Sequence, residues 1–97
     1  MITVHFFEEK SGVRISGHSG YAHEGSDIVC ASVSSAVYMV ANTLTEVIDA
    51  DVDIKVNDAF LELSLRTTTS YTDMLIDGLY RHLNQLSGQY PQYIVIK

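Results

Sequence analysis

The 97-residue sequence has a single cysteine and few basic residues, and each shortage excludes a class of protein. One cysteine cannot form an intrachain disulfide, so a small secreted domain held by disulfides is excluded. It also leaves no resolving thiol, which argues against a redox or thiol-transfer protein. With 6 Lys and Arg against 12 Asp and Glu, the net charge is −6. Direct binding of nucleic acid is therefore not expected, because a phosphate backbone requires a basic stripe.

The sequence also lacks an evident targeting or membrane segment. The first ten residues, MITVHFFEEK, have no basic region before an apolar run and no cleavage-like site. No stretch approaches the roughly 20 apolar residues that a membrane span requires. We therefore expect a cytoplasmic protein without membrane association. A chain of 97 residues suits one small domain comprising residues 1–97.

Apolar residues recur at strand and helix periods in turn, which predicts an α+β domain with the order ββαββαβ. The two expected helices have apolar residues at three- and four-residue steps and cover residues 28–48 and 71–86. The expected strands alternate at every second residue and cover residues 2–8, 13–18, 52–57, 61–66 and 92–96. The simplest arrangement places both helices on one face of a mostly antiparallel five-stranded sheet, in an order that the pattern does not give.

Capping residues predict where the helices begin and end. Asp27 is a favoured N-cap for the first helix. Ser70, followed three residues later by Asp73, resembles a capping box for the second helix. Gly88 is a plausible C-cap, and Pro91 prevents continuation. The apolar stripe predicted for the inner face of the second helix includes Tyr71, Met74 and His82.

The segment 17–34, GHSGYAHEGSDIVCASVS, contains the only cysteine and two of the four histidines. Cys30 falls in the first turn of the predicted helix, where unpaired amides and the helix dipole favour an anion. This position predicts a lowered thiol pKa and nucleophilic chemistry, because the thiolate is the reactive species. The alternative is that Cys30 is a small buried hydrophobe, as isolated cysteines often are.

His18 is the natural base for such a nucleophile, since it lies at the end of the predicted second strand and a loop could return it to Cys30. The amides of Cys30 and Ala31 would then stabilise an oxyanion. The alternative is a surface histidine at a strand end. Asp27 has two candidate roles, capping the helix or orienting His18, and capping fits its position better.

The loop between the two candidate residues is rich in glycine. Gly17 precedes His18, and Gly20 and Gly25 would let the loop open and close over an extended peptide. His18, His23 and Cys30 could be three zinc ligands, but the tight ligand spacing and second cysteine of such sites are missing. The Lys-Ser/Thr of a phosphate-binding loop is also absent. We expect no metal and no other cofactor.

Gly17-His18, a glycine-containing loop, and Asp27-Ile28-Val29-Cys30-Ala31 together resemble the signature of the ribosomal-processing cysteine protease family. The resemblance implies an endopeptidase with Cys30 as nucleophile and His18 as general base. It implies removal of the N-terminal extension of bacterial large-subunit ribosomal protein 27, and a homodimer. The first helix is poor in charge, which is compatible with a second subunit. The alternative function is a non-catalytic module that binds the ribosome or a ribosomal protein, with a buried structural cysteine.

Overall fold

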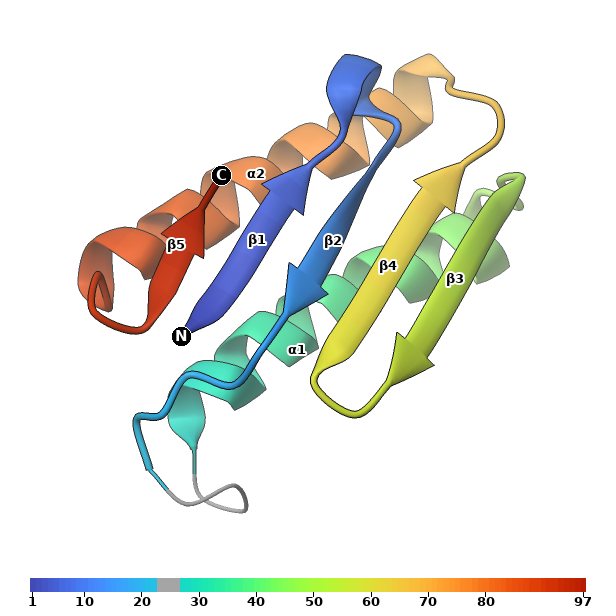
Figure 1. Cartoon of the computed structure of the whole chain (residues 1–97). Coiled ribbons are helices and arrows are strands. Elements are labelled where there is room, and N and C mark those ends of the chain that lie inside the picture. Colours follow the sequence, from blue (N-terminus) through green and yellow to red (C-terminus); the bar gives the residue numbers. More distant parts are fainter. Residues whose placement is uncertain (23–26) are drawn as a thin grey trace.

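The computed structural model describes residues 1–22 and 27–97, which form one five-stranded sheet with two long helices on the same face (Figure 1). The helices are α1 (Ile28–Asn42), which continues into the π-helical segment η3 (Thr43–Val47), and α2 (Ser70–Gln89). The strands are β1 (Ile2–Phe6), β2 (Gly12–Ser16), β3 (Val52–Asn57), β4 (Phe60–Leu65) and β5 (Ile94–Ile96). The predicted α+β class, the ββαββαβ order and the mostly antiparallel sheet are confirmed.

The strand order, which the sequence pattern did not give, is β3-β4-β2-β1-β5. All neighbouring pairs are antiparallel except β1 and β5, which are parallel. The pairing of Ser16 with Phe60 places the end of β2 beside the start of β4. Figure 1 shows the consequence, because the end of β2, the β3–β4 turn and the first turn of α1 lie at the same end of the sheet.

The core lies between the sheet and the two helices. Strand β4 shows the clearest alternation, with Leu61, Leu63 and Leu65 buried and the residues between them partly exposed. The helices contribute buried apolar residues at helical spacing: Val29, Val33, Val37, Val40, Ala41 and Leu44 from the first, and Ile76, Leu79, Leu83 and Leu86 from the second. Each fully buried aliphatic side chain of this size stabilises the fold by about 1.5–3 kcal/mol relative to exposure.

The predicted capping box of α2 is displaced by one residue. The Thr69 hydroxyl accepts from the Thr72 amide at 3.2 Å, and the Thr72 hydroxyl accepts from the Thr69 amide at 2.8 Å. Ser70 is therefore the first helical residue rather than the cap. Two threonines satisfy both amides, so the Ser70–Asp73 pair has no capping role.

The outer face and the end of α2 also differ from the prediction. Ile76, Leu79 and Leu83 set which side of the helix faces the core, and this leaves Tyr71 and Met74 more than half exposed and His82 exposed. The helix runs through Gly88 to Gln89, and Tyr90 is its C-cap, with its amide donating to the Leu86 carbonyl at 2.8 Å.

Three strands are shorter than predicted, and β5, expected over residues 92–96, covers only Ile94–Ile96. β1 ends at Phe6, because the chain enters a single 3-10 turn, η1 (Glu8–Lys10), in which Glu9 and Lys10 have positive φ angles. β2 ends at Ser16, so His18 lies beyond the strand rather than at its last position.

The segment Ile28–Val47 is long and apolar enough, by length and composition alone, to cross a membrane, with a mean hydropathy of 1.5. Such a segment was not expected from the sequence. Val29, Val37 and Leu44 are fully buried on its inner side. Packing against the sheet therefore accounts for part of this apolar character, as it does in core helices generally.

Candidate active site

Gly17 turns the chain out of β2 toward the site. Its amide donates to the Ala59 carbonyl at 2.8 Å, which ties the strand end to the β3–β4 turn. Its φ of +90° lies in the region that side-chain-bearing residues avoid, and an added Cβ would lie 2.4 Å from the carbonyl oxygen of Met1. A glycine is therefore required immediately before His18, for both conformational and steric reasons.

Asp27 caps the start of α1, as predicted. Its Oδ1 accepts from the Val29 amide at 3.0 Å and from the Cys30 amide at 2.9 Å, and its Oδ2 accepts from the Ser19 hydroxyl. Burial acts to raise the pKa of this carboxyl. Hydrogen bonds from Ser19, from Cys30 and from the Val29 amide outweigh burial, so the pKa lies below its ordinary value. Asp27 is therefore a buried, ionised carboxylate at neutral pH.

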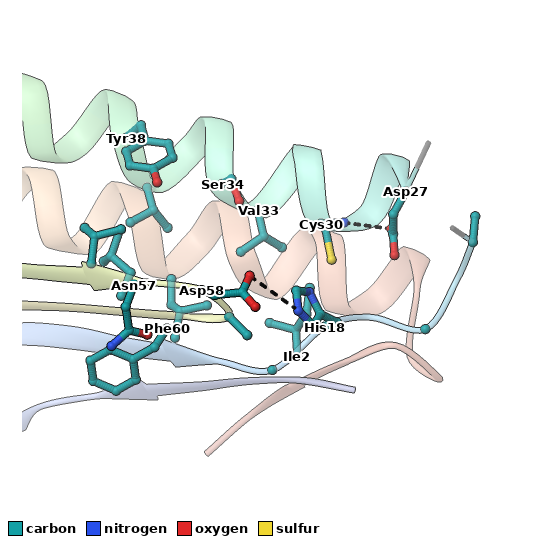
Figure 2. A pocket seen from close by; sticks show the side chains of 18 residues that line it. Ile2, His18, Asp27, Cys30, Val33, Ser34, Tyr38, Asn57, Asp58 and Phe60 are labelled. Carbon is teal, nitrogen blue, oxygen red and sulfur yellow. Dashed lines mark hydrogen bonds and ion pairs between the residues drawn. The ribbon is translucent and has the colours of Figure 1, made fainter. Parts of the chain in front are cut away.

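Cys30 is half-buried and lines a cavity of about 350 Å³ between α1 and the sheet (Figure 2). The Ser19 amide donates to its Sγ at 3.3 Å. A thiol sealed in the apolar interior would meet neither a cavity nor a donor of this kind. The position of Cys30 therefore suits a reactive thiol better than a purely structural one.

His18 lines the same cavity as Cys30, with about 50% of its side chain exposed. Its Nε2 lies 3.9 Å from Oδ1 of Asp58, a residue of the β3–β4 turn, and Figure 2 marks this contact with a dashed line. Among the hydrogen bonds of the described residues, none joins His18 to Cys30. The two side chains face one cavity from opposite walls, since His18 follows β2 and Cys30 belongs to α1.

The carboxylate that pairs with His18 in the structure, Asp58, was not identified from the sequence. Asp58 lies in the turn between two of the predicted strands, and the sequence offers no signal that links it to a histidine beyond the end of another strand. Asp27, the carboxylate that was considered for orienting His18, is engaged with Ser19 and with amides of α1. The interaction of His18 with Asp58 depends on the pairing of β2 with β4, which places the turn beside the strand end.

The predicted oxyanion donors require a correction. The Cys30 amide donates to the Asp27 carboxylate at 2.9 Å, and the Ala31 amide donates to the Asp27 carbonyl at 3.1 Å. Both amides are therefore engaged in this structure and are not free to bind an oxyanion. The physical reason is that the cap residue uses its side chain and its backbone carbonyl on the same helical turn.

The cavity has an apolar floor and a polar rim. The floor is formed by apolar residues of the sheet and of α1: Ile2, Ile15, Leu61, Val33 and Val37. This surface could accept an apolar side chain of a peptide next to the sulfur. Gly20 lies at the rim with a φ of +75°, and nothing lies within 4 Å of where its Cβ would be.

Two of the predicted site residues, Gly25 and the alternative zinc ligand His23, lie outside the described residues. Within residues 1–22 and 27–97, no group of three His, Cys, Asp or Glu side chains is arranged to hold a metal ion. The chemistry that the described residues support is that of a thiol, an imidazole and two carboxylates around one cavity.

Comparison with known proteins places this site in a family. The family model for cysteine protease Prp matches residues 1–95. A crystal structure of the S. aureus ribosomal processing protease Prp with a covalently linked product peptide is similar over 100% of this chain and 98% of that chain, at 23% identity and a TM-score of 0.89. The same S. aureus protease with a substrate peptide is similar over 100% and 98% of the two chains, at 21% identity and a TM-score of 0.85.

The SMU.848 protein from Streptococcus mutans is also similar, over 100% of this chain and 92% of that chain, with 25% identity and a TM-score of 0.85. No curated protein sequence matches the chain significantly. The family match covers nearly the whole chain, and the matched residues include His18, Cys30 and the start of α1. The chain therefore belongs to the Prp family of cysteine proteases.

Proposed function

We propose that this cysteine protease is an endopeptidase in which Cys30 is the nucleophile and His18 is the general base. The observation that carries the proposal is that both side chains line one cavity, with the sulfur in the first turn of α1 and an amide donating to it. In Figure 2 the sulfur points into this cavity on the side of the His18 ring. A rearrangement on substrate binding would bring the two groups within hydrogen-bond reach, since catalytic hydrogen bonds often tighten only in the complex with substrate.

The proposed reaction is acyl transfer through a thioester. His18 takes the proton of the Cys30 thiol, and the sulfur attacks the scissile carbonyl carbon. The carbon–nitrogen bond then breaks, and His18 returns its proton to the leaving amine. Water, deprotonated by the same imidazole, hydrolyses the thioester and regenerates the thiol. Asp58 stabilises the imidazolium that forms in each half of the reaction, since its carboxylate lies 3.9 Å from Nε2.

We propose the N-terminal extension of bacterial large-subunit ribosomal protein 27 as the substrate. The similar S. aureus structures are described as those of a ribosomal processing protease with product and substrate peptides. The apolar floor of the cavity suits an apolar side chain beside the cleaved bond. The net charge of −6 favours association with a basic ribosomal protein. Such processing would take place in the cytoplasm, without a direct contact to nucleic acid.

We further propose that the protein is a homodimer. The outer side of α1 and η3 carries large apolar residues that are exposed in the single chain: Ile28 at 51%, Met39 at 61% and Val47 at 77%. The stretch from Ile28 to Thr45 has no charged residue to oppose contact with a second copy. A second subunit would remove this surface from water.

The test is incubation of the purified protein with the extended ribosomal protein, followed by mass analysis of the products. Wild-type protein should release the extension, and Cys30→Ser and His18→Ala should lower the rate at least about 1,000-fold without unfolding. His82→Ala, which changes an exposed histidine on α2, is the matched control and should cleave normally. Equal cleavage by Cys30→Ser would exclude Cys30 as the nucleophile, and a wild type that releases no product would instead favour the non-catalytic binding module.

A further inference from the structure

Ser19 is a buried polar residue to which the mechanism above gives no role. It follows His18 directly, and 3% of its surface is exposed. Among the described residues, the buried polar or charged side chains are those of Ser19, Asp27 and Thr72, and Thr72 belongs to the capping box of α2. The other two contact each other beside Cys30. A buried polar contact at a catalytic site calls for an explanation of its own.

Ser19 closes a ring of hydrogen bonds that passes through the nucleophile. The Cys30 amide donates to Oδ1 of Asp27, the Ser19 hydroxyl donates to Oδ2 of Asp27, and the Ser19 amide donates to Cys30 Sγ at 3.3 Å. The Tyr21 amide donates to the Ser19 hydroxyl oxygen at 3.0 Å. Because an ionised carboxylate can only accept, the Ser19 hydroxyl must direct its proton toward Asp27. The orientation of Ser19 is therefore fixed from two sides.

We propose that Ser19 is a positioning residue that holds its own amide against the sulfur of Cys30, an inference that rests on the proposed catalytic role of Cys30. Its hydroxyl acts through Asp27 and does not touch the substrate. An amide donor that faces the sulfur stabilises the thiolate after the thiol proton has moved to the imidazole. Ser19 also adjoins His18 in the chain, so the same anchor fixes the backbone of the base relative to the nucleophile.

The experiment compares Ser19→Ala with Ser87→Ala. Ser87 is a matched control, because its hydroxyl also makes a partly buried hydrogen bond, to the Ile94 carbonyl at 3.1 Å, between α2 and β5. The rate of alkylation of Cys30 by iodoacetamide is measured from about pH 5 to about pH 10, a range that spans ordinary thiol ionisation. The melting temperature of each variant is measured alongside.

We expect Ser19→Ala to lower the alkylation rate at pH 7 about tenfold, the factor that corresponds to one hydrogen bond to a charged group. Its rate should approach that of the wild type at high pH, where the thiol is ionised in both proteins. The kcat for peptide cleavage should fall by a similar factor with little change in KM. Ser87→Ala should lower the melting temperature without moving the pH profile. An unchanged pH profile in folded Ser19→Ala would overturn the proposal.

Two further measurements keep the test decisive if Ser19→Ala does not fold. Ser19→Thr retains the hydroxyl and should retain the wild-type pH profile. In the wild-type protein, the amide proton resonance of Ser19 should show a transition at the midpoint of the alkylation profile, and this transition should be absent from Cys30→Ala. An amide resonance that does not follow the ionisation of Cys30 would contradict the proposed contact.

The outcome for Ser19 can be separated from that for the proposed substrate. Alkylation and the amide resonance require no peptide, so they test Ser19 alone. If the profile moves in Ser19→Ala but the wild type leaves the ribosomal extension intact, the substrate is wrong and the role of Ser19 stands. If the wild type cleaves and Ser19→Ala matches it in kcat and in pH profile, the role of Ser19 is wrong and the proposed function stands.

Discussion

Replacing Asp27 with alanine should destabilise the protein strongly at neutral pH. The carboxylate is the helix cap of α1, and loss of such a cap costs about 1 kcal/mol. The change also leaves the buried Ser19 hydroxyl without its acceptor, which adds about 1–3 kcal/mol. The total is about 2–4 kcal/mol, which for a domain of this size corresponds to a fall in melting temperature of about 10–20 °C.

The effect of Asp27→Ala should depend on pH in a defined direction. Hydrogen bonds lower the pKa of Asp27 in the folded protein. Its stabilising contribution is therefore complete above the unfolded-state carboxyl pKa of about 3.9, and it is lost as the pH falls through the lower folded-state value. The difference in unfolding free energy between wild type and variant should be larger at pH 7 than in acid.

The assay is thermal and urea denaturation, followed by circular dichroism, at a series of pH values. Glu46→Gln removes the same charge from an exposed position on η3 and serves as the control, with an expected effect within about 0.5 kcal/mol. The reasoning would be refuted if Asp27→Ala resembled Glu46→Gln at pH 7. It would also be refuted if the destabilisation were the same at neutral and acidic pH, since the charge of Asp27 would then be irrelevant.

Three further predictions concern the strand end, the hairpin turn and the outer face of α1. Gly17→Ala should lower the unfolding free energy by more than about 2 kcal/mol, because of the positive φ and the contact with Met1, whereas Gly20→Ala should lower it by about 1 kcal/mol because of its φ alone. Urea denaturation measures both effects, and equal effects would contradict the steric explanation. Asp58→Asn should lower kcat/KM a few-fold at low salt and much less in about 0.5 M salt, where the Debye length is only a few ångströms. A loss that does not depend on salt would exclude an electrostatic role. Met39→Lys should convert a dimer to a monomer in sedimentation experiments while the single-chain fold is retained, and an unchanged mass would argue against an interface at α1.

The features that could be predicted from the sequence are those with local causes. Helix and strand periods are properties of neighbouring residues, so the order of elements was correct. The cap formed by Asp27 was also predictable, since a cap interacts with amides two and three residues away. The cap of α2 was misplaced because Ser70–Asp73 and Thr69–Thr72 offer equivalent local patterns, and the helix phase set by the core decided between them.

The features that could not be predicted depend on contacts between distant segments. Asp58 approaches His18 only because β4 pairs with β2, and the strand order is not encoded in the alternation of apolar residues. The Ser19 ring likewise requires the strand end and the helix start to meet. The oxyanion assignment failed for a different reason. Helix-start amides were treated as free, although a capping aspartate that was itself predicted occupies them.

Because β5 pairs in parallel with β1, both strands run away from the N-terminus, and the C-terminus lies beyond the far end of the short β5 (Figure 1). Met1 lies against Gly17 at the catalytic end, whereas Lys97 follows β5 farther along β1, with its amide donating to the Val4 carbonyl at 2.7 Å. An affinity tag or fusion partner joined before Met1 would therefore emerge beside the cavity and compete with incoming peptide. The same fusion joined after Lys97 would leave the entrance open, which makes it the suitable design for the cleavage assays.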